Sequence, residues 1–177
     1  MDYKDYEIGK SGDDFWFRAK KQLIKNYKEL DELCKTYLKK YKIAYSIKTN
    51  SLKPVIKTLN KLGSGFEAAS LQELKLIPKK SEFTILNGPC KTKKELQIAI
   101  KRNYLINIDS LQEIQQIAEI LKSQKHKDQN NKKLEIGLRI SLIQSKFGID
   151  QSQLQQALTL IKENNMQLTS LHFHQGT

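Results

Sequence analysis

Apolar and polar residues follow two different periods along the chain, and each change of period marks a new element. Between residues 13 and 41, apolar residues recur at intervals of three and four, which predicts an amphipathic helix, in one piece or broken in two. A short apolar run at 43–47 then predicts a strand. Pro54 near its start and Gly63 beyond its end bound a second predicted helix, which runs through Lys61.

The same strand–helix unit recurs through the rest of the chain. Further strands are predicted at 65–69, 83–86, 104–108, 134–140 and 168–174. Several of the helices begin with Ser or Thr followed three residues later by Glu, a capping-box pattern: Ser70 with Glu73, Thr92 with Glu95, and Ser110 with Glu113. A last helix is predicted at 151–164, and the polar stretch 123–133 is expected to form a surface loop.

This alternation of strands and helices predicts an α/β fold with a parallel sheet and right-handed crossovers. Two closures are compatible with it. A doubly wound open sheet is complete with six strands, whereas a (β/α)8 barrel of the TIM type is incomplete, with about six of its eight strands present. The pattern alone leaves both open.

Composition narrows the class of function. The chain has 177 residues and a formal charge of +12, but its lysines are scattered over polar positions of the helices without interleaved aromatic residues, so no nucleic-acid site is expected. No apolar run reaches the roughly 18 residues of a membrane span, and no secretory signal is recognised at the start. Cys34 and Cys90 have neither zinc-site nor disulfide spacing, so a reducing cytoplasm is the expected location.

Charged residues at strand ends are the first candidates for chemistry, because loops after the carboxyl ends of strands build the sites of α/β folds. Lys48 ends the first strand; it is either an amine suited to Schiff-base chemistry or an edge lysine that reaches solvent. Glu67 and Arg139 lie in or at the end of the second and fifth strands, where we expect them to pair with partners inside a site.

The last strand carries two histidines. His172 and His174 alternate, so both are expected on one side of that strand, and together they could share a metal ion. No further ligands accompany them, so no metal is expected. Gly176 and Thr177 then provide a turn and a hydroxyl, which is a weak signal for a phosphate cradle.

Seven motifs between residues 45 and 177 resemble, in the same order, those of the pyridoxal-phosphate-dependent ornithine and diaminopimelate decarboxylases. Residues 45–50 (YSIKTN) resemble YAVKAN, and residues 65–74 (GFEAASLQEL) resemble GFDVAS..EL. Residues 87–96 match NGP.K...EL, and residues 108–110 (IDS) match VDS. Residues 138–140 (LRI), 145–148 (SKFG) and 171–177 (LHFHQGT) resemble LRIN, SKFG and GLHFHVGS.

The resemblance implies an alanine-racemase-like barrel that binds pyridoxal 5'-phosphate. Lys48 would attach covalently to the cofactor and act in catalysis, together with His174, which would stack on the cofactor ring. Thr177 would help to hold the phosphate, at a position where family members carry Ser. Glu67, at a position usually occupied by Asp, and Arg139 would complete the cofactor-binding set.

The resemblance also implies an activity and an assembly. We expect residues 1–42 to form an N-terminal helical segment and residues 43–177 a partial cofactor-binding barrel without the family's C-terminal β domain. As the N-terminal part of a larger homodimeric enzyme, the chain would serve the decarboxylation of a basic or dibasic amino acid such as diaminopimelate, ornithine or lysine, and would be inactive alone. The alternative is a truncated, non-catalytic homologue that binds or regulates a full-length decarboxylase. A racemase is a weaker third hypothesis.

Overall fold

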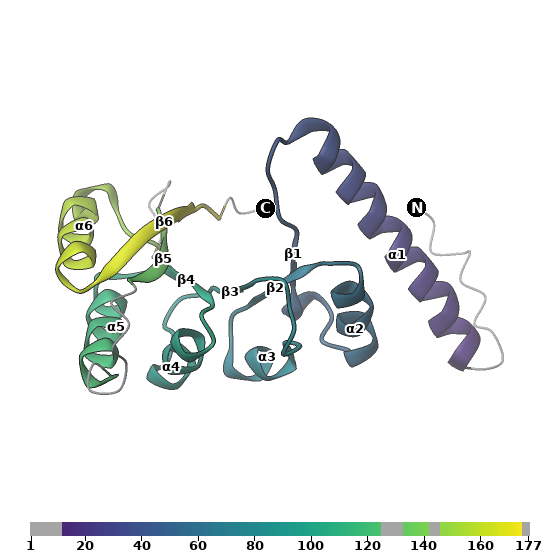
Figure 1. Cartoon of the computed structure of the whole chain (residues 1–177), viewed down its shortest axis with the longest axis horizontal. Helices are drawn as coiled ribbons and strands as arrows, with labels where there is room; N and C mark the ends of the chain where they lie inside the picture. Colours follow the sequence, from purple (N-terminus) through teal and green to yellow (C-terminus); the bar gives the residue numbers. More distant parts are fainter. Residues whose placement is uncertain (1–11, 125–132, 142–145, 175–177) are drawn as a thin grey trace.

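The computed structural model describes residues 12–124, 133–141 and 146–174. It begins with α1 (Gly12–Tyr37), a single continuous helix rather than two. Figure 1 shows α1 leaning away from the rest of the molecule at one end. The side chains of Leu23 and Tyr27 pack against the core, while Phe17, Leu30 and Leu33 are exposed.

The remaining elements alternate as the sequence predicts. In chain order they are β1 (Ala44–Ser46), the 3-10 turn η2 (Ile47–Thr49), α2 (Lys53–Lys61), β2 (Gly65–Ala68), α3 (Leu71–Leu76), β3 (Thr84–Leu86), α4 (Lys93–Lys101), β4 (Leu105–Ile108), α5 (Leu111–Gln124), β5 (Leu134–Arg139), the 3-10 turn η3 (Gln151–Gln153), α6 (Leu154–Glu163) and β6 (Met166–His172).

The sheet has the topology of a barrel. Its six strands are all parallel and lie in the order β1-β2-β3-β4-β5-β6, and α2 to α5 lie along one face of the sheet (Figure 1). A doubly wound sheet reverses its strand order and carries helices on both faces. The structure therefore confirms the incomplete (β/α)8 barrel.

A contact between distant strands shows that the sheet is curled. Asn87 follows β3 and His172 ends β6, with β4 and β5 between them, yet Asn87 Nδ2 lies 3.4 Å from His172 Nε2. In a flat sheet three strand spacings would separate them by about 14 Å. The face opposite the helices is thus the concave, interior side of the partial barrel.

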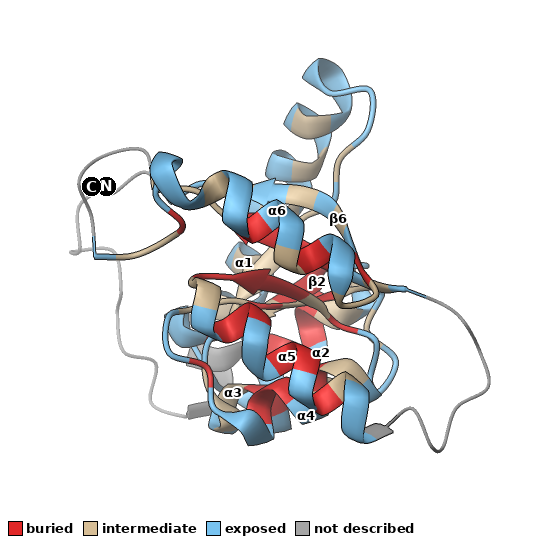
Figure 2. Ribbon diagram, turned by 90° about the vertical axis from the view of Figure 1, so that its left-hand side faces the viewer, coloured by how far each residue is buried: buried red, intermediate tan, exposed pale blue. Residues whose placement is uncertain are grey.

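The hydrophobic core lies between the sheet and its helices. Ala68, Leu86, Ile106 and Ile136 are register neighbours on the helix side of β2 to β5, and all four are fully buried. Figure 2 shows the buried residues concentrated on the strands and on the helix faces turned toward them. Helix residues that belong to this core include Leu59, Leu74, Leu96, Ile114 and Ile117.

Some predicted ends are wrong by a few residues. β1 ends at Ser46, so Lys48 lies in η2 rather than in a strand. β6 ends at His172, so His174 lies beyond it and the two histidines do not share a strand face. α5 includes Ser123 and Gln124, and residues 125–132 of the predicted loop lie outside the described part of the chain.

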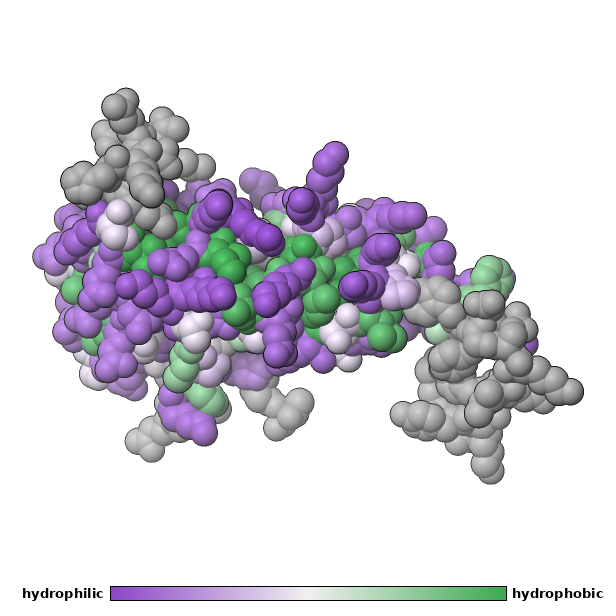
Figure 3. All heavy atoms as spheres, turned by 90° about the horizontal axis from the view of Figure 1, so that it is seen from below, coloured by the Kyte–Doolittle hydropathy of each residue, from purple (hydrophilic) through white to green (hydrophobic). Residues whose placement is uncertain are grey.

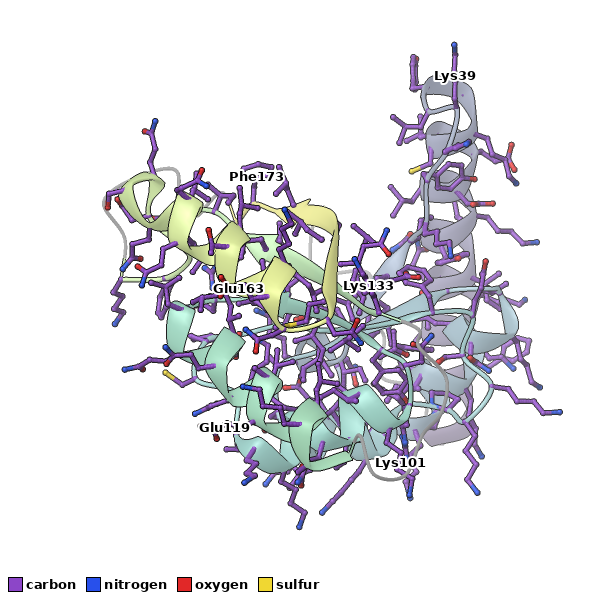
Figure 4. All side chains as sticks on the ribbon, turned by 60° about the vertical axis from the view of Figure 1, so that its left-hand side comes forward. Lys39, Lys101, Glu119, Lys133, Glu163 and Phe173 are labelled. Atoms are coloured by element: carbon purple, nitrogen blue, oxygen red, sulfur yellow. The ribbon has the colours of Figure 1, made fainter. Side chains whose placement is uncertain are left out.

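The outer surface of the helices is rich in charge. Figure 3 shows hydrophilic side chains over most of the helical face, with hydrophobic ones visible between them. Lys39, just beyond α1, Lys101 of α4 and Glu119 of α5 project outward (Figure 4). Scattered lysines are exposed as expected: Lys20, Lys21, Lys25, Lys28, Lys40, Lys79, Lys80, Lys93 and Lys94. Within the described residues, no helix is long and apolar enough to cross a membrane.

Candidate functional site

The interior face of the sheet becomes polar toward the carboxyl ends of the strands. Parallel strands in register place paired residues on the same face. Ser46 pairs with Glu67 at one level, and Asn107 pairs with Gly137, which in turn pairs with Ser170, on the same face. At the outermost level Arg139 pairs with His172. A polar lining at this end is where barrel folds build their active sites.

Two features of this face suit a polar planar cofactor. Four buried atoms have no hydrogen-bond partner among the described residues: Ser46 Oγ, Asn87 Oδ1, Ser170 Oγ and His172 Nδ1. In addition, a Cβ at Gly137 would overlap Asn107 Oδ1 and lie 2.7 Å from Ser170 Oγ, so glycine is required where these side chains converge. The donors and acceptors of this face therefore fit pyridoxal phosphate, which carries oxygen atoms and a ring nitrogen.

Arg139 is held by a partner that the sequence did not reveal. Its Nη1 donates to Asp109 Oδ1 at 2.7 Å, with side chains 12% and 8% exposed, and its guanidinium lies 5.1 Å from the centre of the Phe147 ring. Asp109 directly follows β4, in the IDS motif, but its chain position alone does not show that it meets the end of β5. The pairing expected for Arg139 is thus confirmed, and the partner is Asp109.

A second ion pair is buried behind this one. Lys91 Nζ lies 3.0 and 2.9 Å from the two carboxylate oxygens of Glu113, with the two side chains 1% and 4% exposed. Burial raises the pKa of Glu113, although Lys91 opposes the shift. Lys91 falls within the motif at 87–96, but sequence reasoning assigned this lysine no role, and Glu113 was predicted only as part of a helix cap with Ser110. Lys91 follows an Asn-Gly-Pro turn, and Gly88 in that turn has a φ of 91°.

His172 is half-buried at the carboxyl end of β6. Its pKa is lowered from the ordinary value of 6.5, first by burial and then by the positive charge of Arg139. This shift favours the neutral form of the ring. A neutral imidazole can donate through one nitrogen and accept through the other, which suits a contact with an uncharged or anionic polar group.

The other predicted site residues differ in how far they are buried. Glu67 is half-buried on the interior face of β2. It makes no hydrogen bond or ion pair with the other described residues, so the partner expected for it is not found among them. Lys48 is exposed, two residues beyond Ser46, as the solvent-reaching alternative has it. His174 is exposed beyond the end of β6, and Thr177 lies outside the described residues.

A metal site at the histidines gains no support from the geometry. Across residues 12–124, 133–141 and 146–174 no group of three or more His, Cys, Asp or Glu side chains could hold a metal ion. Cys34 and Cys90 are both free.

Comparison with known proteins agrees with this geometry. Residues 21–177 match the family model described as "Pyridoxal-dependent decarboxylase, pyridoxal binding domain". Diaminopimelate decarboxylase of Methanocaldococcus jannaschii is 32% identical over 121 residues, which cover 64% of this chain and 28% of that protein. Diaminopimelate decarboxylase of Helicobacter pylori is 28% identical over 176 residues, which cover 89% of this chain and 41% of that protein.

Solved structures show the same fold. The crystal structure of diaminopimelate decarboxylase from M. jannaschii superposes with a TM-score of 0.76 at 25% identity, over 89% of this chain and 41% of that one. This chain thus spans less than half the length of the two decarboxylases compared above. Because the family model covers most of the sequence, the chain belongs to the pyridoxal-dependent decarboxylase family and consists largely of its pyridoxal-binding domain.

Proposed function

We propose that this protein is the cofactor-binding part of a pyridoxal-phosphate-dependent decarboxylase of basic or dibasic amino acids. The observation that carries the proposal is the polar interior face at the carboxyl ends of the strands, with Lys48 two residues beyond Ser46 and with buried polar atoms on that face that lack partners among the described residues. A structural barrel interior is ordinarily filled by branched apolar side chains. Polar groups retained there point to ligand binding.

We assign each candidate residue a task, from its position where the structure describes it and otherwise from the matching motif. Lys48, with its exposed amine, attaches the cofactor covalently. Arg139, fixed by Asp109, presents a cation at the end of β5, and Glu67 presents a carboxylate on the interior face of β2. His174 stacks on the ring and Thr177 binds the phosphate, as the matching motif implies. The bound cofactor supplies an electron sink for the carbanion that forms as carbon dioxide leaves.

Basic amino acids are the substrate class that the relatives favour. The relatives include diaminopimelate decarboxylases and a biosynthetic arginine decarboxylase. The M. jannaschii diaminopimelate decarboxylase has been crystallised with L-lysine. The formal charge of +12 suits a substrate carboxylate and a cofactor phosphate, because both are anions.

The sheet also supports assembly with further polypeptide. β1 and β6 each pair with one neighbour only within the described sheet. Strand edges present unpaired backbone N–H and C=O groups, which favour the addition of another strand. We propose that further strands close the barrel in a larger cytoplasmic homodimer. The same edges favour the alternative, a non-catalytic homologue that binds a full-length decarboxylase.

Decarboxylase activity of the complete product of the gene that encodes this chain tests the proposal. We expect release of carbon dioxide from lysine, ornithine or diaminopimelate, loss of that activity in Lys48→Ala, and full activity in Lys53→Ala, a control at another exposed lysine. Retained decarboxylation in Lys48→Ala would overturn the assignment of Lys48. A wild-type protein that releases no carbon dioxide but co-purifies with a full-length homologue would support the alternative.

A further inference from the structure

Three equivalent glutamates lie in the first turns of α3, α4 and α5, and among the described residues only Glu113 binds a lysine. The backbone N–H groups of Glu73, Glu95 and Glu113 each donate to the Ser or Thr hydroxyl three residues earlier. Each carboxylate also accepts a backbone N–H at the start of its own helix or just before it. Capping is thus complete at Glu95 without any buried cation, so capping does not explain why Lys91 is buried against Glu113.

The Lys91–Glu113 pair carries a cost that helix capping does not require. Removing an ammonium and a carboxylate from water is energetically unfavourable, and well-packed apolar residues often replace such pairs without loss of stability. The ammonium has three N–H donors, and it meets three acceptors: the Gly88 carbonyl at 2.7 Å, the Asn107 carbonyl at 2.6 Å and the Glu113 carboxylate. It therefore joins the ends of β3 and β4 to the start of α5.

The pair is connected directly to the residue that holds Arg139. Glu113 Oε2 accepts the Asp109 backbone N–H at 2.8 Å, and Asp109 Oδ1 accepts from Arg139 Nη1 at 2.7 Å. Along this series of contacts two cations, Lys91 and Arg139, thus flank two carboxylates, Glu113 and Asp109. The inner pair is almost fully buried, whereas the outer guanidinium lies at the end of β5, beside His172 in the register.

We propose that Lys91 and Glu113 are positioning residues that fix the backbone at Asp109 and thereby set the direction of the Arg139 guanidinium. The contacts that hold Arg139 lie within this chain. That Arg139 is thereby placed toward pyridoxal phosphate rests on the proposed function. Neither Lys91 nor Glu113 lies on the polar interior face itself, so both act through Asp109.

Nuclear magnetic resonance of the whole chain without cofactor tests the geometry. The Nε–Hε signal of Arg139 is recorded in wild type, Glu113→Gln and Lys91→Met. Asp109→Ala, which removes the acceptor, provides the reference for a released guanidinium. The matched control is Glu95→Gln, which alters an equivalent helix cap whose carboxylate accepts from Leu71 and Thr92 rather than from Asp109. We expect the Arg139 signal to move toward the Asp109→Ala position in Glu113→Gln and Lys91→Met, and to stay in place in Glu95→Gln.

Two results would overturn the proposal: an unchanged Arg139 signal in folded Glu113→Gln, or an equal displacement in Glu95→Gln, which would indicate general loosening. If the single variants fail to fold, the double variant Lys91→Met/Glu113→Leu leaves no lone buried charge, and the same displacement of the signal is expected. A folded double variant with the wild-type signal would likewise overturn the proposal.

Cofactor titration separates this inference from the proposed function. In Glu113→Gln the displaced Arg139 guanidinium should make a weaker hydrogen bond to pyridoxal phosphate. We therefore expect the affinity for pyridoxal phosphate to fall about tenfold in Glu113→Gln and to be unchanged in Glu95→Gln. If the Arg139 signal moves in Glu113→Gln but the affinity stays the same, the positioning role stands and the cofactor role of Arg139 is wrong.

Discussion

His172 lies half-buried at the end of β6, where several charges act on its ring. Arg139, His174 and Lys91 lower its pKa and Asp109 raises it, but burial is the largest cause and lowers the pKa below 6.5. The folded protein therefore binds a proton at His172 less readily than the unfolded chain does. The free energy of unfolding should consequently fall as the pH drops from about 6.5 toward the lowered pKa.

Two measurements check this pH dependence. Titration of the imidazole signals should place the pKa of His172 below 6.5, and urea unfolding should show less stability at pH 5.5 than at pH 7. His172→Gln, which keeps a polar side chain but does not titrate, should reduce that difference. A pKa at or above 6.5, or an unchanged pH dependence in the variant, would contradict the assignment.

Single residues also show where sequence reasoning ends. The pattern places Glu67 within β2 and Arg139 at the end of β5, and the structure confirms both positions. It could not identify Asp109 as the partner of Arg139, because that contact depends on how the ends of β4 and β5 meet in space. Burial of Lys91 was equally hidden, since a lysine after a turn is ordinarily solvated.

Helix starts are the elements that the sequence predicts best. At α4 the Thr92 hydroxyl accepts the Glu95 N–H, and the Glu95 carboxylate accepts the Thr92 N–H, which completes the predicted capping box. At α3 and α5 the glutamate reaches one residue further back, to the N–H groups of Ala69 and Asp109. Local sequence fixes these contacts because all partners lie within four residues.

The cap of α4 gives a prediction for stability. Thr92→Ala removes the hydroxyl that accepts the Glu95 N–H, so we expect the free energy of unfolding to fall by about 1 kcal/mol. Thr92→Ser keeps the hydroxyl and should lose much less. Urea unfolding of the two variants measures the difference, and equal stabilities would show that the cap contributes nothing.

Gly137 of β5 gives a prediction for the interior face. An alanine Cβ there would overlap Asn107 Oδ1 and crowd Ser170 Oγ, so Gly137→Ala should destabilise the protein by about 1–3 kcal/mol. Asn107→Ala makes room for that Cβ, and the double variant should therefore lose less stability than the two single variants combined. Strict additivity in a double-mutant cycle would show that the two side chains do not meet.

Strand ends were harder to predict than helix starts. β6 begins at Met166, two residues before the predicted start, directly after Asn165, which has a φ of 57°. It ends at His172, so the alternation that placed His174 on the same face does not continue. The apolar run at 43–47 likewise includes Ile47, which is buried although it belongs to the turn η2. An apolar residue next to a strand can therefore be buried without belonging to that strand.

At the scale of the whole molecule, the sequence predicted alternating elements but left their closure undecided. The strand order and the helices on one face favour the barrel, and the Asn87–His172 contact across β4 and β5 shows its curvature. That contact joins residues far apart in the chain, so no local pattern reveals it. The resemblance of the motifs implied a barrel, and the strand order of the sheet shows one.

Covalent labelling tests the central claim, that the partial barrel holds pyridoxal phosphate at Lys48. The chain is mixed with an equimolar amount of pyridoxal phosphate, reduced with borohydride, digested and mapped by mass spectrometry. We predict one dominant label on Lys48, its loss in Lys48→Arg, and little label on Lys53, which is also exposed. Label spread evenly over the exposed lysines, or unchanged in Lys48→Arg, would contradict the account.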